Sequence, residues 1–321
     1  HLSFASEFDY TSFGFGGGYT WLFNQKNTEF SLKGNIYLDK WNPRYPTELD
    51  SWLEAGQSIT NGFFRNVDIL DQNGNTINKN GSNVWKPVNA TLVDNNNRNS
   101  YSISFGFSQI ISKKAQFSVF FDLVQQKGWL SNPMQRVYFA DKANYYIGNA
   151  AGIPVYTSKN NKDVFQLADD IERLPDTRFK FPFGLRFNYF INSNFVLRTY
   201  YRFYIDDWGI VSHTIDFEVP IKIAGKFTLY PGYRYYTQTA ANYFFPYDSA
   251  LSTNPFYTSD YDLSEFNTNQ YSIGFGYTDI FTKFHISKLG LKNIDIRYSY
   301  YTRNTGFSAN QVSASFIFVV D

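Results

Sequence analysis

Apolar residues alternate with small or polar residues, at a period of two, in long segments along most of the chain. In residues 13–23, aromatic side chains occupy most of the alternate positions, with Ser, Gly or Thr between many of them. Segments 101–108 and 181–191 follow a similar pattern. Because residues i and i+2 of a strand share a face, each segment has one aromatic face and one small or polar face. The pattern predicts β-strands, and segments of about ten to twelve residues are typical of strands that span a membrane.

About twelve such segments predict an antiparallel transmembrane β-barrel. They lie near 2–9, 12–23, 28–39, 99–111, 115–127, 180–192, 194–205, 210–221, 226–238, 268–280, 291–302 and 307–320. The connections are of two kinds. Tight ones lie at 24–27, 112–114, 192–194 and 224–225, and long ones lie near 40–98, 128–179 and 239–267. Tight turns on one rim and long loops on the other are the usual barrel asymmetry, which predicts that the long loops are extracellular.

The composition favours a membrane barrel over a soluble β-sandwich, which would also alternate. Aromatic residues make up 21% of the chain and charged residues 18%. An apolar phase this rich in Phe and Tyr is expected of a lipid-facing surface with aromatic girdles. No run approaches the length of apolar sequence that a transmembrane helix needs. We therefore predict a single barrel domain over residues 1–321 in the outer membrane of a Gram-negative bacterium, with the lipid bilayer as its first partner.

Several classes of function are disfavoured. The chain has no cysteine, which excludes a thiolate metal site and a cysteine nucleophile. Its formal charge of +1 does not indicate the basic surface that nucleic-acid-binding proteins present. The G-x-S-x-G motif is absent, so we expect no enzyme and no organic cofactor. Because a barrel is secreted, we also expect a signal peptide ahead of the segment given.

Charged residues on the non-aromatic phase of the C-terminal strands are the candidates for lining a transport path. They are Arg186, Arg198, Arg202, Asp216, Glu218, Arg234, Asp295 and Arg297. A hairpin around 206–209 would bring Arg198 near Asp216 or Glu218. One interpretation is a positively biased conduit for anions. The other is a network of paired charges that fills a narrow lumen, because unpaired buried charge is strongly disfavoured.

Two loop regions carry weaker signals. Asp260 and Asp262 have a spacing that suits calcium, although acidic loops are also common for solvation alone. The stretch 40–56 contains Trp41, Tyr45 and Trp52 and is too apolar for a simple loop tip. It is expected either to fold over the lumen as a plug or to contact a partner.

His213 shares a phase with apolar neighbours near the outer end of its strand, so we expect it on the lipid side at an interfacial or inter-subunit contact.

The C-terminal half resembles a known family. The strings RTYYRFYIDDWGIVSHT (198–214), YRYYTQTAANYFFPY (233–247) and FYTSDYDLSEFNTNQYSIGFGYTDIF (256–281) are similar to an outer-membrane barrel family of Bacteroidota that is known only as a domain of unknown function. The resemblance implies a secreted outer-membrane protein with no catalytic residues to carry over. It also implies further strands ahead of this segment, and about fourteen to sixteen strands in the complete barrel.

Two functions remain open from the sequence. The first is a porin-like or gated channel for small polar or anionic solutes, which the arginines favour. The second is a non-catalytic accessory subunit with a closed lumen that holds another outer-membrane protein or a surface lipoprotein. The aromatic loops and the balancing acids favour this second function.

Overall fold

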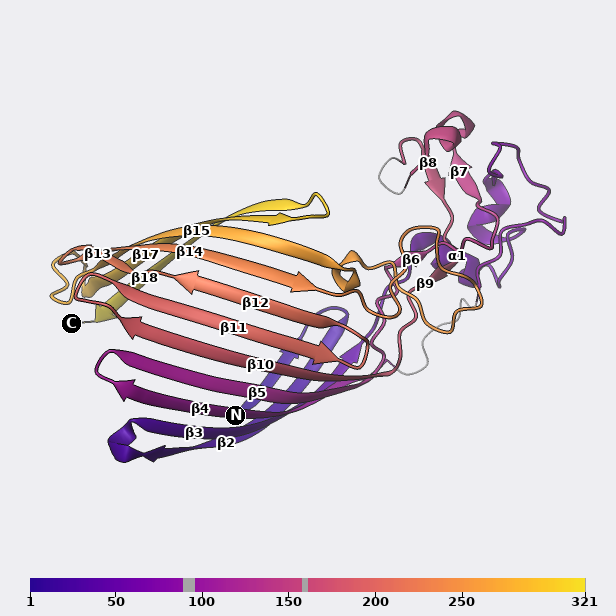
Figure 1. Ribbon diagram of the computed structural model, residues 1–321. Helices are drawn as coiled ribbons and strands as arrows, with labels where there is room; N and C mark the ends of the chain where they lie inside the picture. Colours follow the sequence, from indigo (N-terminus) through magenta and orange to yellow (C-terminus); the bar gives the residue numbers. More distant parts are fainter. Residues whose placement is uncertain (89–95, 158–160, 321) are drawn as a thin grey trace.

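The computed structural model describes residues 1–88, 96–157 and 161–320. It has two parts: a wall of long antiparallel strands and a smaller lobe beyond one end of that wall (Figure 1). The wall is a single 14-stranded sheet. In the described part of the chain, no helix is both long enough and apolar enough to cross a membrane.

The strands of the wall follow one another in sequence and in space. They are β1 (Leu2–Ser6), β2 (Tyr10–Phe23), β3 (Thr28–Trp41), β4 (Arg98–Ser112), β5 (Ala115–Gly128), β10 (Thr177–Phe190), β11 (Val196–Asp206), β12 (Val211–Glu218), β13 (Ile221–Ala224), β14 (Phe227–Gln238), β15 (Phe266–Thr278), β16 (His285–Ile286), β17 (Leu289–Arg303) and β18 (Ser308–Val320). All their pairings are antiparallel. The predicted fold class is confirmed in that the chain is nearly all β and builds one large sheet of long antiparallel strands.

One predicted strand is broken. The sequence predicts a single strand over 210–221, but the structure has β12 and β13 with a break at Val219 and Pro220. Proline has no N–H to donate to a ladder, which explains the break. The neighbouring backbone is still bonded: the Val219 N–H donates to the Pro231 carbonyl at 3.0 Å, and the Val196 N–H donates to the Pro220 carbonyl at 3.2 Å.

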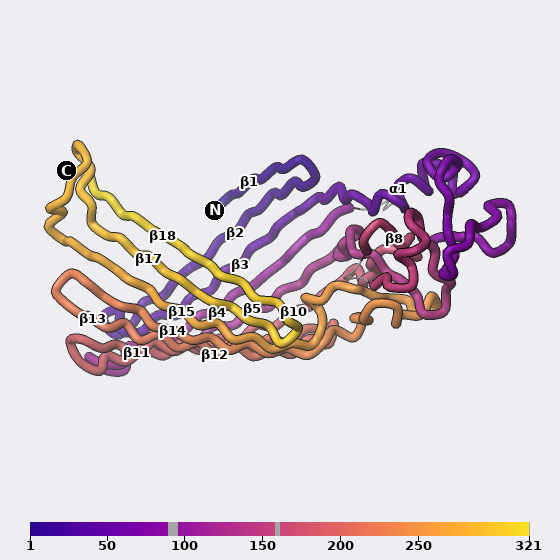
Figure 2. The backbone as a smooth tube through the Cα atoms, turned by 90° about the horizontal axis from the view of Figure 1, so that it is seen from above, coloured from indigo at the N-terminus to yellow at the C-terminus, as the bar shows by residue number. Residues whose placement is uncertain are grey.

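The sheet is a curved wall with β1 and β18 at its two edges (Figure 2). Among the described residues, no strand pairing joins β1 to β18. One face of the wall carries large exposed side chains. Tyr19 is 64% exposed and Phe23 is 51% exposed, and both lie on the phase opposite to Gly14 and Gly16 of the same strand.

The three long connections lie at the lobe end of the wall, and the short turns 7–9, 207–210 and 304–307 lie at that end too. Turns 24–27, 113–114, 191–195 and 225–226, together with the connection 279–288, join strands at the opposite end. The long connections are 42–97, 129–176 and 239–265, and they meet in the lobe. The lobe contains α1 (Thr47–Glu54), β6 (Arg136–Val137), β7 (Tyr146–Gly148), β8 (Val164–Gln166), β9 (Asp170–Ile171) and the 3₁₀ turns η2 (Gly62–Asn66), η3 (Ala150–Val155) and η4 (Tyr261–Leu263). The long connection predicted near 40–98 includes residues 89–95, which lie outside the described residues.

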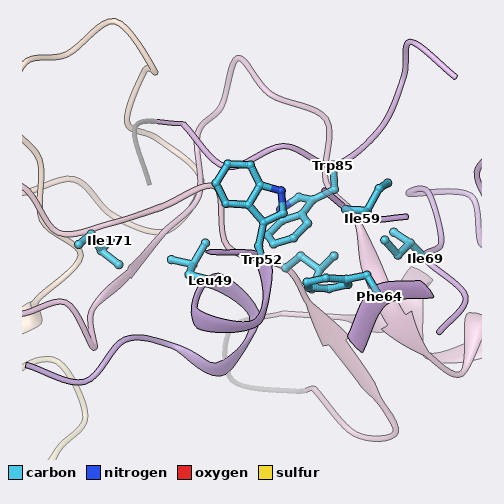
Figure 3. Close-up of a cluster of buried hydrophobic side chains, with 8 residues drawn as sticks. Leu49, Trp52, Ile59, Phe64, Ile69, Trp85 and Ile171 are labelled. Atoms are coloured by element: carbon cyan, nitrogen blue, oxygen red, sulfur yellow. The ribbon is translucent and has the colours of Figure 1, made fainter. Parts of the chain in front are cut away.

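The lobe has its own hydrophobic core. Leu49 and Trp52 are three residues apart on α1 and therefore point to the same side of the helix. They pack with residues from both of the first two long connections (Figure 3): Ile59, Phe64, Ile69, Trp85, Leu167 and Ile171. Burying each aliphatic or Phe side chain contributes about 1.5–3 kcal/mol. The long connections thus form a folded unit of their own.

This core corrects one expectation. Trp52 was predicted to contact a partner or plug the lumen, but its side chain is only 3% exposed and lies inside the lobe. The apolar residues of 40–56 are largely buried inside the lobe, because they complete a core that also includes Leu167 and Ile171, more than a hundred positions away.

Candidate functional site

The strand register brings the predicted lumen residues to one face of the wall. Directly opposed residues in antiparallel strands point to the same side of the sheet. Arg198 opposes Glu218, and Asp216 opposes Arg234. Arg186 opposes Tyr200, which lies on the same phase as Arg198 and Arg202. We call this surface the charged face; the opposite surface, which carries Tyr19 and Phe23, is the outer face.

Six of the eight predicted residues form ion pairs. Arg198 Nη1 lies 2.8 Å from Glu218 Oε1, and Arg297 Nη1 lies 2.7 Å from Glu218 Oε2. Arg297 Nε also contacts Asp295 Oδ1 at 2.7 Å.

Arg234 Nε lies 2.8 Å from Asp216 Oδ2. The expectation that Arg198 would approach Asp216 or Glu218 agrees with the pair to Glu218.

The contact between Arg297 and Glu218 crosses the sheet. Arg297 is on β17 and Glu218 is on β12, with β14 and β15 between them. Gly232 of β14 opposes Glu218, and Gly274 of β15 opposes Arg297. Because these intervening positions lack side chains, the two long side chains can meet above them. A contact across two strands also indicates that the wall curves toward the charged face.

Two of the five candidate arginines have no ion pair in the part of the chain that the structure describes. The Arg186 guanidinium lies over the rings of Phe120 and Tyr200, at 5.4 Å from each centroid. Arg202 is exposed and opposes the small residue Gly184. Among the eight candidates, three acids balance three of the five arginines, so Arg186 and Arg202 leave this set with an excess of positive charge.

The charged face borders a cavity of about 690 Å³. Its lining includes Arg186, Arg198, Arg234 and Arg297, together with the small polar residues Ser272 and Ser313. The side chains of Arg198 and Arg234 are 51% and 49% exposed, so their charged groups are accessible although they are paired. The paired charges therefore border a cavity that their charged groups can reach.

The outer face holds a second hollow, an apolar groove of about 1020 Å³. Gly17 and Gly34 oppose each other at its floor, and Phe15, Ile36, Ile103 and Leu123 are among its walls. A Cβ added at Gly17 would meet no heavy atom within 4 Å. The groove exists because glycines occupy positions where the rest of the outer face carries large side chains.

Buried carboxyl groups tie the long connections together in the lobe. The Glu172 carboxyl accepts a hydrogen bond from the Asn132 N–H at 2.6 Å and one from the Thr258 hydroxyl. Asp169 Oδ2 accepts from the Phe139 N–H at 2.8 Å. Burial raises the pKa of both Asp169 and Glu172 to about 7, although these hydrogen bonds act in the opposite direction.

The three remaining partner-contact candidates lie in different places. Trp41 ends β3 at the base of the lobe, where its Nε1 donates to Asp9 at 3.4 Å. Tyr45 is partly buried against the lobe core. His213 is on the outer face, opposite Phe203, and a hydrogen bond of 2.8 Å joins its Nδ1 to the Tyr201 hydroxyl. The structure does not bring these residues together.

The calcium candidates make other contacts. Asp260 Oδ1 accepts the Asp262 N–H at 2.9 Å, and Asp262 Oδ1 contacts the Arg303 guanidinium at 2.9 Å. Within the described ranges, no group of three or more His, Cys, Asp or Glu side chains is arranged to hold a metal ion.

Sequence reasoning missed the role of the lobe acids. Asp169, Asp170 and Glu172 stand in a run that reads as an ordinary acidic loop, yet all three are at most 5% exposed. It also missed the bidentate pair of Arg136 with Glu48, whose atoms lie 2.6 and 3.1 Å apart. These partners are 88 residues apart in sequence, so no local spacing could have indicated them.

The chain belongs to a family described as protein of unknown function (DUF3570), which matches residues 2–313. No curated protein matches the sequence.

Solved structures that resemble the chain include several outer-membrane proteins. One is the KdgM porin in complex with disordered oligogalacturonate, with 7% identity, a TM-score of 0.32 and coverage of 97% of this chain and 92% of that one. Another is the toluene transporter TodX of Pseudomonas putida, with 10% identity, a TM-score of 0.34 and coverage of 91% and 68%. A mutant ferric enterobactin receptor from Pseudomonas aeruginosa has 9% identity and a TM-score of 0.40, and the match covers 99% of this chain but only 40% of the receptor. The function of this chain is therefore inferred from its own residues.

Proposed function

We propose that the protein is an outer-membrane channel whose charged face forms a conduit for small polar or anionic solutes. The observation that carries the proposal is the cavity of about 690 Å³ bordered by accessible arginines, with two of the face's arginines left without an ion pair among the described residues. Fixed positive charge along a wet path lowers the barrier for anions and raises it for cations.

The outer face supports a membrane location. Its exposed Phe, Tyr and Trp side chains would be costly in water over so large an area, and they match the lipid-facing band and aromatic girdles of membrane barrels. In this arrangement the lobe, which is built from the long connections, would face the cell exterior.

The test is single-channel recording in a planar bilayer with the double variant R186Q/R202Q of the full-length protein. These two arginines have no ion pair within the described ranges, so replacing them leaves no acid there uncompensated. We expect the preference for chloride over potassium to fall by roughly twofold or more. Arg65→Gln removes an exposed arginine from the lobe and serves as the matched control. Unchanged selectivity in correctly folded R186Q/R202Q would refute the conduit.

A second candidate function rests on a different observation, the apolar groove on the outer face. An accessory subunit that holds another outer-membrane protein or a surface lipoprotein would use such a hollow to seat part of its partner. Pull-down of the tagged full-length protein from its native membrane in mild detergent distinguishes the two. A stoichiometric partner supports the accessory function, and recovery of the protein alone supports an autonomous channel.

A further inference from the structure

A small aromatic pocket lies in the lobe, between the second and third long connections. It has a volume of about 140 Å³. Its walls include Tyr138 from the second connection and Phe245, Tyr247 and Tyr261 from the third, and Asp248 lies among them. The pocket is separate from the charged face, so a function for it does not rest on the proposed conduit.

The aromatic walls are held in place by the folded lobe. The rings of Tyr138 and Tyr247 meet edge to face, with centroids 5.3 Å apart. The Tyr247 hydroxyl donates to Gln166 Oε1 at 2.5 Å, and Gln166 is fully buried. The Ala140 N–H donates to the Ala250 carbonyl at 2.9 Å, which fixes the third connection against the second. Such walls are preorganised, so a ligand would not have to order them.

Two charged residues line the pocket, Arg136 and Asp248, and they differ in whether they have an ion-pair partner. Arg136 is neutralised by Glu48, to which it makes two hydrogen bonds, and its guanidinium lies 5.3 Å from the centroid of the Phe165 ring. Asp248 has no ion pair among the described residues, and its Oδ1 is buried without a hydrogen-bond partner there. A buried carboxylate oxygen with nothing to bind is costly, because it has lost its water without a replacement.

Asp248 is also held in an unusual backbone conformation, with φ of +55°. Among residues other than glycine, Asp and Asn tolerate this left-handed region best. The fold therefore places an acidic side chain here at some conformational cost.

We propose that this pocket binds an organic ammonium ion. The faces of Tyr and Phe attract a cation through their quadrupoles, and aromatic cages of this kind recognise alkylated ammonium groups. The Asp248 carboxylate supplies the opposite charge at the wall of the pocket. A neutral sugar could also stack on tyrosines, but it would not compensate the negative charge of Asp248.

The experiment is calorimetric titration of the detergent-solubilised full-length protein with choline chloride as the probe. The same titration is repeated with dimethylbutanol, the uncharged carbon isostere of choline, and with glucose. We expect choline to bind and dimethylbutanol to bind about tenfold more weakly or not at all.

Asp248→Asn is the decisive variant, because Asn has the same shape and tolerates the same backbone. It should weaken choline binding by about tenfold or more. Tyr261→Leu, at a side chain that is 50% exposed, should weaken binding with little risk to folding. The matched control is Asp163→Asn, since Asp163 is an exposed lobe residue with φ of +58°, and it should bind choline as the wild type does.

Three results would overturn the proposal. One is a folded wild-type protein that does not bind choline. Another is that Asp248→Asn binds choline as tightly as the wild type does, or that the wild type binds dimethylbutanol as tightly as choline. The third is binding of glucose alone, which would make the pocket a site for a neutral sugar.

Discussion

Replacing Glu172 by Gln should change how the stability of the lobe depends on pH. Glu172 is 2% exposed and connects two of the long connections, through the Asn132 N–H and the Thr258 hydroxyl. Burial disfavours its ionised form, so its pKa rises from 4.5 to about 7 in the folded lobe. The unfolded lobe lacks this burial, and there Glu172 titrates near its ordinary value.

The direction in which stability changes with pH follows from the number of protons that each state binds. Between about pH 4.5 and pH 7 the folded lobe keeps the Glu172 proton, while the unfolded lobe has lost it. The folded state binds more protons, so its free energy of unfolding decreases as the pH rises through this window. A pKa difference of this size corresponds to about 3 kcal/mol. Asp169, whose pKa burial also raises to about 7, adds a second contribution of the same sign.

Gln has nearly the shape of Glu but cannot ionise. Glu172→Gln should therefore match the wild type near pH 4.5 and exceed it by about 3 kcal/mol at pH 8. The assay is urea unfolding of the lobe in detergent, followed by the fluorescence of Trp52 and Trp85, which lie in its core.

Glu54→Gln is the matched control, because Glu54 is exposed at the end of α1. A wild-type lobe whose stability is unchanged or higher at pH 8 would refute the reasoning. Equal pH dependence in the wild type and in Glu172→Gln would refute it as well.

The core of the lobe and the outer groove each give a further prediction. Trp52→Ala removes an almost fully buried indole and should destabilise the lobe by about 3–5 kcal/mol in the same urea assay. The strand content measured by circular dichroism should stay unchanged. A loss of stability below about 1 kcal/mol would show that the lobe core does not depend on this residue. Gly17→Leu fills the groove where an added Cβ meets no atom within 4 Å, so it should preserve folding and, if the protein is an accessory subunit, abolish co-purification of the partner. The control is Gly225→Leu, at a turn position that is equally open. If the partner still co-purifies with Gly17→Leu, the groove is excluded as the contact surface.

The wall of the barrel could be predicted because its signal is local. Alternation of apolar and polar residues places each strand, and the short turns fix the order of neighbours. The same alternation assigned Arg198, Arg234 and Glu218 to one face, since it depends only on the period of a strand. The break at Pro220 was missed because the apolar alternation continues across it.

The lobe could not be predicted, because its signal is distant in sequence. Trp52 looked like an exposed interaction residue until Leu167 and Ile171 were found beside it in the core. Asp169 and Glu172 looked like solvated acids because their hydrogen-bond partners lie far from them in sequence. No short-range period describes such packing, so composition alone suggested a surface where the structure has an interior.

The conduit is tested most directly by the reversal potential of the full-length wild-type protein across a KCl gradient in a planar bilayer. An excess of fixed arginines on the charged face predicts a current whose reversal potential shifts toward that of chloride. A shift toward potassium, or a correctly inserted protein that carries no current, would contradict the account.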